Sequence, residues 1–210
     1  GADVVIAGPS QETADVAVLE HVECDGVTYV HAFDQPDIIA GQGTLGLEIL
    51  EDMPDTASVL IPLSGGGLFA GVAMAMKSLN PNIHTVGITM ENGPAMIDSL
   101  KAGHPVPVNE VKSLADALGG TIGLQNELSF DMTKRYIDET ALVSEDEIAG
   151  AMRTLFLKDQ VVVEGGGAVG VAALLSGRLD LPDGPVAIII SGCNVEMTKF
   201  MEIVSAPPKA

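Results

Sequence analysis

The sequence predicts an α/β protein built as three layers, with an open parallel sheet between two layers of helices. Apolar stretches of strand length alternate along the chain with apolar stretches of helix length, which is the pattern of parallel α/β sheets. Short connections join residues 58–63, 68–79 and 84–90, so a strand, a helix and a second strand form a right-handed crossover unit. The 210 residues, 47% of them hydrophobic, can bury a substantial core.

The first part of the chain predicts two short strands and two helices. Val4-Val5-Ile6 indicates a buried strand, and a turn at residues 8–10 follows it, in which Ser10 can cap the next helix. The predicted elements are a strand at 3–8, a helix at 11–23, a strand at 27–33, a connector at 34–37 and a helix at 45–51.

The central crossover unit has the clearest pattern. Its helix is apolar on nearly every side, with Lys77 as its first charge, so we expect it to be buried. Further along, Ser144 and Glu147 form the S-x-x-E pattern of a capping box, which predicts the start of a helix. The other predicted elements are helices at 94–102, 130–137 and 145–157, a glycine-rich junction at 161–170 followed by a helix that runs to about Ser176, strands at 141–144 and 186–190, and a short last helix, while residues 113–124 fit no element.

A run of three glycines joins the first strand of this unit to its helix. Because Gly65, Gly66 and Gly67 lack a Cβ atom, the backbone from Ser64 to Leu68 can aim successive N–H groups at one point. The helix that follows adds unpaired N–H groups and the positive end of its dipole. We favour a phosphate site here, although the plainer interpretation is a turn whose glycines only allow close packing.

Two later loops carry polar residues. Glu164 stands between three valines and three glycines, where it is either a ligand contact or a cap for the next helix. Ser191 ends the last predicted strand, which we expect to be buried, and its hydroxyl either bonds a ring nitrogen or caps the last helix. Since the carboxyl ends of parallel strands meet at one edge of a sheet, the Ser191 loop and the glycine loop should converge there and form a cofactor site.

Composition excludes several function classes. With 29 acidic and 10 basic residues the net charge is -19, which disfavours nucleic acid and anionic membranes as partners. No uninterrupted apolar run reaches the roughly 18 residues that a membrane span needs, so we expect no membrane anchor and a cytoplasmic location. Cys24 and Cys193 lie far apart, and the four histidines show no ligand spacing, so we predict no metal site.

Four motifs resemble, in the same order, the signatures of the serine/threonine dehydratases, which are pyridoxal-phosphate enzymes of fold type II, the tryptophan-synthase-β-like fold. They are IIAGQGTLGLE at 38–48, IPLSGGGLFAG at 61–71, VVEGGGAVG at 162–170 and ISGCNV at 190–195. The resemblance covers essentially the whole chain. Residues 113–124, SLADALGGTIGL, look most like the hydroxyectoine utilization dehydratase branch.

The resemblance implies a site and a reaction. The backbone N–H groups of the glycine loop would bind the cofactor phosphate, and the Ser191 hydroxyl would bond the pyridine nitrogen. The residues implied to bind pyridoxal 5'-phosphate are Ser64, Gly65, Gly66, Gly67, Leu68, Glu164 and Ser191. The implied substrate is a 3-hydroxy amino acid of the threonine or serine type, or a hydroxyectoine breakdown product. Loss of its β-hydroxyl would give a keto acid and ammonia, and the full-length protein is expected to be a homo-oligomer.

Parts of the family pattern are missing. No lysine stands in a Ser-x-Lys-x-Arg context, so the Schiff-base lysine is expected upstream of Gly1, and no residue of this chain is assigned that role. The chain would then be the C-terminal portion of a longer enzyme, truncated at its N-terminus and inactive alone. Residues 1–33 would be the remnant of a smaller domain, 34–205 the large cofactor-binding domain and 206–210 a tail. Cys193 replaces a glycine that is usual in relatives, which should crowd the turn.

Two other interpretations stay open. Gly65, Gly67 and Ala70 fit the loose dinucleotide pattern G-x-G-x-x-A. Glu91 ends the next strand, where a ribose-binding acid is expected. These residues favour a nicotinamide-dependent oxidoreductase domain, although they leave the Ser191 loop unexplained. The absent lysine would also suit a non-catalytic domain that binds a small molecule.

Overall fold

The sheet is parallel, as predicted. The computed structural model describes residues 1–8 and 11–206, and in this part of the chain four strands lie in the order β3-β2-β1-β4. The strands are β1 (Ser58–Pro62), β2 (His84–Met90), β3 (Glu139–Val143) and β4 (Val186–Ile188). Ser10, predicted as a helix cap, and nearly all of the predicted tail at 206–210 lie outside the described residues.

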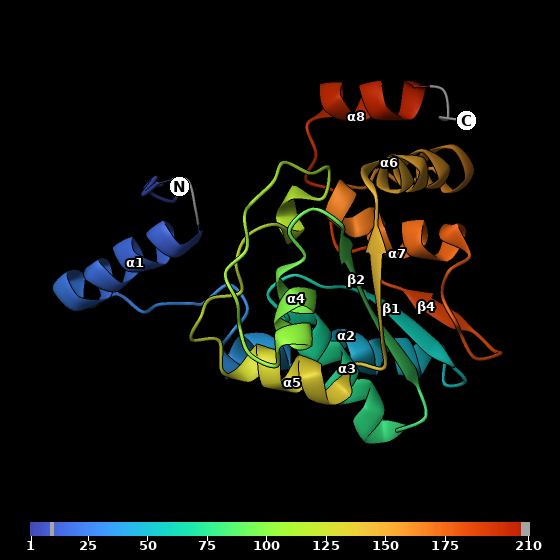
Figure 1. Cartoon of the computed structure of the whole chain (residues 1–210), viewed down its shortest axis with the longest axis horizontal. Coiled ribbons are helices and arrows are strands. Elements are labelled where there is room, and N and C mark those ends of the chain that lie inside the picture. The colour runs from blue at the N-terminus through green and yellow to red at the C-terminus, as the bar shows by residue number, and fades with distance from the viewer. Residues whose placement is uncertain (9–10, 207–210) are drawn as a thin grey trace.

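Eight helices form in the described part of the chain, and all but the first belong to the layers on the two sides of the sheet (Figure 1). They are α1 (Gln11–Asp25), α2 (Pro36–Asp52), α3 (Gly67–Leu79), α4 (Ala95–Ala102), α5 (Leu128–Tyr136), α6 (Glu145–Thr154), α7 (Gly165–Ser176) and α8 (Met197–Ser205). A 3-10 turn at Asp116–Leu118 lies in the segment that sequence patterns left unassigned, and a π-helical stretch at Leu155–Asp159 extends α6. The predicted capping box is confirmed, since the Ser144 backbone N–H donates to Glu147 Oε2 at 2.8 Å and Ser144 Oγ accepts the Glu147 N–H.

The alternation of side chains along β1 builds two cores. Leu60 packs into the cluster that includes residues of α6, α7 and α8, whereas Val59 and Ile61 pack into the cluster that includes residues of α3, α4 and α5. Figure 1 shows the first group of helices above the sheet and the second group below it. The predicted three-layer arrangement is therefore confirmed, and α3 is buried along most of its length.

Glycines let α2 and α3 pack with their backbones in close approach. A Cβ atom on Gly71 would lie 2.2 Å from the Ile39 carbonyl oxygen, and one on Gly46 would lie 2.9 Å from the Val72 carbonyl oxygen. This contact explains why α2 is longer than predicted. The sequence suggested a connector at 34–37 and a helix from residue 45, but α2 begins at Pro36, which suits a first helical turn. Two of its glycines, Gly43 and Gly46, face α3.

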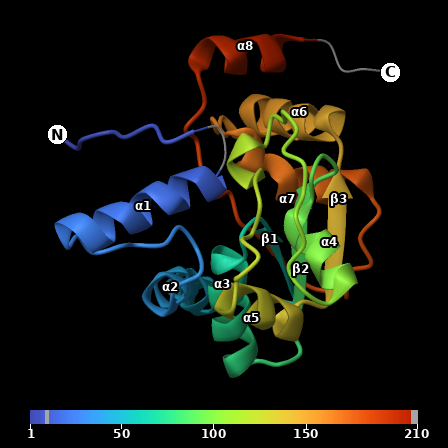
Figure 2. The ribbon, with the colours of Figure 1, turned by 60° about the vertical axis from the view of Figure 1, so that its left-hand side comes forward.

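The two strands predicted within residues 1–33 are wrong. Val4 and Ile6 are 84% and 89% exposed, and no strand forms in residues 1–8 or 26–35. A strand is stable only beside another strand, and none of the described strands lies next to these residues. The helix predicted between them is confirmed as α1, which stands to one side of the sheet and its covering helices in Figures 1 and 2.

None of the described helices is both long and apolar enough to cross a lipid bilayer.

Candidate functional site

The glycine loop between β1 and α3 presents backbone donors that the described chain does not use. Gly65, Gly66 and Gly67 are buried, and Gly66 has a left-handed φ of 94°. Within the described residues, the backbone N–H groups from Ser64 to Leu68 have no hydrogen-bond acceptor, and α3 begins here without a side-chain cap. Buried N–H groups are rarely left without an acceptor, so this cluster of donors indicates an anion site.

The same glycines also pack closely against the protein. A Cβ atom on Gly65 would lie 2.3 Å from the Phe33 ring, and one on Gly67 would lie 2.8 Å from the Phe33 carbonyl oxygen. A Cβ atom on Gly66 would meet Met96, Thr133 and Ser129 instead. Close packing therefore explains why these positions are glycine, while the unused N–H groups are what point to an anion.

Ser191 and Leu68, the last residue of the predicted phosphate site, lie at the same cavity. Leu68 and Ser191 line one cavity of about 500 Å³, together with Gln42, Leu45, Ile49, Ala187, Ile188, Ile189 and Ile190. The two residues come together because β1 and β4 are neighbouring parallel strands, with Ser58 opposite Val186 in the register. This cavity lies at the sheet edge where ligands of parallel α/β proteins bind.

Ser191 differs from its prediction in two respects. It is exposed and lies beyond β4, which ends at Ile188 and not at residue 190, so the expected buried strand end is wrong. It does not cap the last helix either, because α8 begins at Met197 with Glu196 in the cap position. Among the described residues, none forms a hydrogen bond with the Ser191 hydroxyl. The hydroxyl can therefore bond a ligand.

Glu164 binds the loop that carries Ser191. Its carboxylate accepts the backbone N–H of Asn194 at 2.8 Å, and its own N–H donates to the Gly192 carbonyl at 3.1 Å. A Cβ atom on Gly192 would lie 2.5 Å from Glu164 Oε1, so a side chain at that position would displace the Glu164 carboxylate. Glu164 occupies the cap position of α7 but makes no side-chain cap bond, so the predicted cap is wrong.

Cys193 does not crowd the turn as expected. It is exposed, its thiol is free, and its backbone is not left-handed, since Gln160 is the single non-glycine residue with positive φ in the described ranges. A side chain at this position therefore points to solvent without backbone strain.

Glu91, the candidate ribose-binding acid, lies in a different cavity from Ser191. It lines about 330 Å³ together with Ile97, Lys101, Glu139, Thr140, Ala141, Leu142, Ala173, Ser176, Arg178 and Leu179. This cavity shares no lining residue with the one that contains Leu68, which counts against a dinucleotide spanning Glu91 and the glycine loop. Across the part of the chain that the structure describes, no three His, Cys, Asp or Glu residues are grouped to hold a metal ion.

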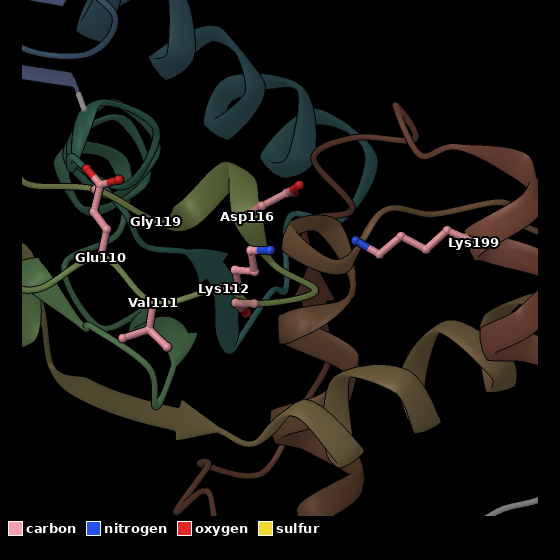
Figure 3. Close-up of a pocket in the computed structure, with 8 residues that line it drawn as sticks. Glu110, Val111, Lys112, Asp116, Gly119 and Lys199 are labelled. Atoms are coloured by element: carbon pink, nitrogen blue, oxygen red, sulfur yellow. The ribbon is translucent and has the colours of Figure 1, made fainter. Parts of the chain in front are cut away.

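A third cavity, of about 650 Å³, carries charges of both signs. Figure 3 shows Lys199 reaching from α8 toward Asp116 and Lys112, which belong to the segment before and within the 3-10 turn. Neither lysine forms an ion pair with any described residue. Glu110, Val111, Ser113, Gly119 and Gly120 complete the lining. Mixed charges of this kind suit a zwitterionic ligand better than a simple anion.

Sequence patterns missed the residues that surround the glycine loop. Asp34 accepts the N–H groups of Glu127, Leu128 and Ser129 at 3.0, 3.0 and 2.7 Å, so it binds the start of α5 although it lies far away in sequence. The residues around Asp34 give no signal of this contact, because its partners lie far along the chain. Phe33, beside it, makes the contact with Gly65.

The fold and the site together define a class of protein: an α/β protein with unused backbone donors in a glycine loop at the carboxyl edge of a parallel sheet. The pyridoxal-phosphate dependent enzyme family matches residues 1–192, and the chain belongs to this family. Its cofactor is therefore pyridoxal 5'-phosphate.

Curated relatives match nearly the whole chain. A Sinorhizobium fredii protein, named provisionally as a threonine dehydratase, is 48% identical over 210 residues. The L-threonine ammonia-lyase of Thermotoga maritima is 43% identical over 98% of this chain, and the catabolic L-threonine dehydratase of Escherichia coli K12 is 39% identical over 96%. The chain spans 63%, 50% and 61% of these relatives' own lengths.

Solved structures share the fold. Threonine deaminase isoform 2 of Solanum lycopersicum, in its processed form, is 33% identical with a TM-score of 0.86, over 97% of this chain and 59% of that one. Maize serine racemase is 28% identical with a TM-score of 0.88, over 96% and 62%. The fold is therefore pyridoxal-phosphate fold type II, as predicted.

The glycine loop fits the phosphate of this cofactor. The N–H groups from Ser64 to Leu68, those of the three buried glycines among them, have no acceptor in the described chain, and they lie at the positive end of the α3 dipole. The chain's own residues thus agree with the cofactor that the family implies.

Proposed function

We propose that the complete protein is a pyridoxal-phosphate dependent ammonia-lyase that removes the β-hydroxyl of a 3-hydroxy amino acid and releases a keto acid and ammonia. The observation that carries this proposal is the cluster of N–H groups without an acceptor from Ser64 to Leu68, at the end of the strand that pairs with β4, after which Ser191 follows. Relatives named L-threonine ammonia-lyase and L-threonine dehydratase support the reaction type.

Each residue of the site has a defined task in this proposal. When bound, pyridoxal 5'-phosphate withdraws electrons from the substrate Cα, which makes its proton removable. The N–H groups from Ser64 to Leu68 bind the phosphate, and the Ser191 hydroxyl bonds the ring nitrogen. Because a hydroxyl carries no charge, it does not hold a proton on that nitrogen as a carboxylate would. Glu164 positions Ser191 through the Asn194 N–H.

The lysine that anchors the cofactor stays a prediction. We propose that it lies outside the residues of this chain, because no lysine of this chain has the family's sequence context. We also propose threonine or serine as the substrate, with a hydroxyectoine breakdown product as the narrower candidate from residues 113–124. A cytoplasmic location and a homo-oligomer complete the proposal.

We further propose that residues 1–33 belong to a smaller domain and residues 34–205 to the large cofactor-binding domain. The exposure of Val4, Val5 and Ile6 supports this division, because apolar residues of strand-forming type are expected to be covered in the complete protein. The position of α1 apart from the sheet layers in Figure 2 agrees with it.

The test is an absorbance titration of the purified complete protein with pyridoxal 5'-phosphate, followed by addition of L-threonine, L-serine and hydroxyectoine-derived amino acids. A visible band that shifts on addition of an amino acid, with keto acid released, is the expected result. A band without turnover of any of them would indicate a non-catalytic binding domain. Tight binding of a nicotinamide dinucleotide without such a band would overturn the proposal.

A Ser191→Ala variant gives the sharper test. We expect it to keep its cofactor but to lose about fivefold in turnover, since one hydrogen bond to the ring is worth roughly 1 kcal/mol. Ser205→Ala, which removes an exposed hydroxyl from the end of α8, is the matched control and should behave as the wild type does.

A further inference from the structure

We propose that Asn126 and Ser129 are positioning residues for the phosphate: they fix the carbonyl of Gly65 so that the N–H of Gly66 faces the cofactor. Neither residue lies in the sequence motifs of the site, and both lie at the start of α5. The inference rests on the proposed function, because it assigns a purpose to the glycine loop as a phosphate site.

Ser129 bonds the Gly65 carbonyl oxygen from a buried position, and Asn126 bonds Ser129. Ser129 Oγ donates to the Gly65 oxygen at 2.7 Å, and Asn126 Nδ2 lies 3.5 Å from that oxygen. Asn126 Nδ2 also donates to Ser129 Oγ at 2.8 Å, so the two side chains form one unit. Ser129 is 0% and Asn126 8% exposed, so water does not compete strongly for these bonds.

Peptide geometry turns this contact into control of the donor. In a trans peptide the carbonyl of one residue and the N–H of the next point in opposite directions, and the described chain contains no cis peptide. Holding the Gly65 oxygen toward α5 therefore turns the Gly66 N–H away from α5. A peptide flanked by glycines can otherwise rotate with little steric resistance, so the loop alone does not select this orientation.

The unit that holds the carbonyl is itself fixed. Asn126 Oδ1 accepts the Phe130 N–H at 2.8 Å, and its Nδ2 donates to the Ile122 carbonyl at 3.0 Å. Asp34 accepts the Ser129 N–H at 2.7 Å. The contacts thus run from Asp34 to the start of α5, from there to Gly65, and so to the donor groups of the loop.

The experiment compares two ligands that differ only in the phosphate. Dissociation constants for pyridoxal 5'-phosphate and for pyridoxal are measured by equilibrium dialysis on the complete protein after removal of its cofactor. Ser129→Ala should weaken binding of the phosphorylated ligand about tenfold, since one fixed donor to a charged group is lost, and leave pyridoxal binding unchanged. The ³¹P resonance of the bound cofactor should also shift.

Ser99→Ala is the matched control. Ser99 is also 0% exposed and accepts a backbone N–H, that of Val106 at 3.1 Å, but it lies in α4 and does not bond the glycine loop. Both dissociation constants should stay at the wild-type values. Ser129→Cys, which retains a weak donor, should fall between Ser129→Ala and the wild type, and it serves the same test if the alanine variant does not fold.

The outcomes separate this inference from the proposed function. If Ser129→Ala weakens both ligands equally, or neither, Ser129 is only structural and the inference is wrong while the phosphate site stands. If the wild-type protein does not prefer the phosphorylated ligand, the phosphate site itself is wrong, and the proposed function fails together with the inference.

Discussion

Lys77 Nζ lies 2.6 Å from Asp138 Oδ2, an ion pair that joins α3 to the residue before β3. Burial raises the pKa of the Asp138 carboxyl, but hydrogen bonds from Lys77 and Thr85 outweigh it and hold the pKa below its usual 3.8. This stabilisation is therefore present above the unfolded pKa and is lost as the pH falls through the lower folded pKa.

We expect Asp138→Asn to destabilise the protein by roughly 1 kcal/mol at neutral pH, a small value because the side chain is 35% exposed and solvent screens the pair. Urea unfolding at pH 7 and again below pH 3 checks this, and the difference from wild type should shrink in acid. Asp98→Asn breaks the exposed 3.5 Å pair with Lys101 and should change little. An equal effect of both variants would contradict the prediction.

Gly71→Ala should disrupt the packing of α2 on α3. The added Cβ atom would lie 2.2 Å from the Ile39 carbonyl oxygen, so the helices must separate, at a cost of about 1–3 kcal/mol or more. Gly41→Ala is the control within α2, because a Cβ atom there meets nothing within 4 Å. It should stabilise by up to about 1 kcal/mol through helix propensity. Thermal unfolding of both variants measures these changes in stability. A Gly71→Ala variant more stable than the wild type would show that α2 and α3 do not pack as described.

Tyr29 should titrate unusually late. Burial, together with the Asp15 carboxylate that accepts its hydroxyl at 3.0 Å, raises the pKa of Tyr29 to about 12. A spectrophotometric titration of the folded protein should contain a tyrosinate component near that pH, and Tyr29→Phe should remove it. Because the folded state holds this proton more tightly, the contribution to stability is lost as the pH rises from 10 toward 12. If Tyr29→Phe instead removes a tyrosinate component that titrates near pH 10, the hydrogen bond between Tyr29 and Asp15 is contradicted.

Glu164→Ala should release the loop after β4. The Asn194 N–H then loses its acceptor, so hydrogen exchange at this amide should speed up by about tenfold, which corresponds to one hydrogen bond of roughly 1.4 kcal/mol. Glu164→Gln keeps an oxygen acceptor and should exchange more slowly than Glu164→Ala. Unchanged exchange in the alanine variant would mean that another group holds this loop.

Lys199→Met should raise KM for an amino-acid substrate by a factor of about two to five, with kcat nearly unchanged, because an exposed charge contributes under about 1 kcal/mol. The reason is that Lys199 lines the cavity of mixed charge in Figure 3 without an ion-pair partner among the described residues. Lys158→Met removes an exposed lysine that does not line this cavity and serves as the control. Equal KM values for the two variants would exclude this cavity from substrate binding.

Most of the sheet could be predicted from the sequence because its signals are local. The apolar strand, the glycines and the apolar helix from Ser58 to Leu79 follow one another directly, and the second strand was placed with the bounds that the structure shows, His84–Met90. The capping box at Ser144 is likewise a pattern within four residues. Membership of the dehydratase-like family followed from four such local motifs and is confirmed at the level of the pyridoxal-phosphate dependent enzymes.

Features that depend on distant partners could not be predicted. Val4-Val5-Ile6 has the composition of a strand, but no strand of the described chain lies beside it. Composition alone therefore predicted a strand that does not form. Glu164 was expected to contact a ligand or cap its own helix; it makes no cap bond, and its contact with Asn194, thirty residues later in sequence, was not expected. The roles assigned to Ser64–Leu68, Glu164 and Ser191 toward the cofactor stay predictions.

The register of the sheet has a consequence for the order of folding. β1 and β2 are joined by one local crossover, but β1 also pairs with β4, with Ser58 opposite Val186. Closing so long a stretch of chain costs more conformational entropy and is slower than forming the local unit. β4 should therefore dock late, and the Ser191 loop that follows it docks with it. The last step of folding is then the step that assembles the cavity.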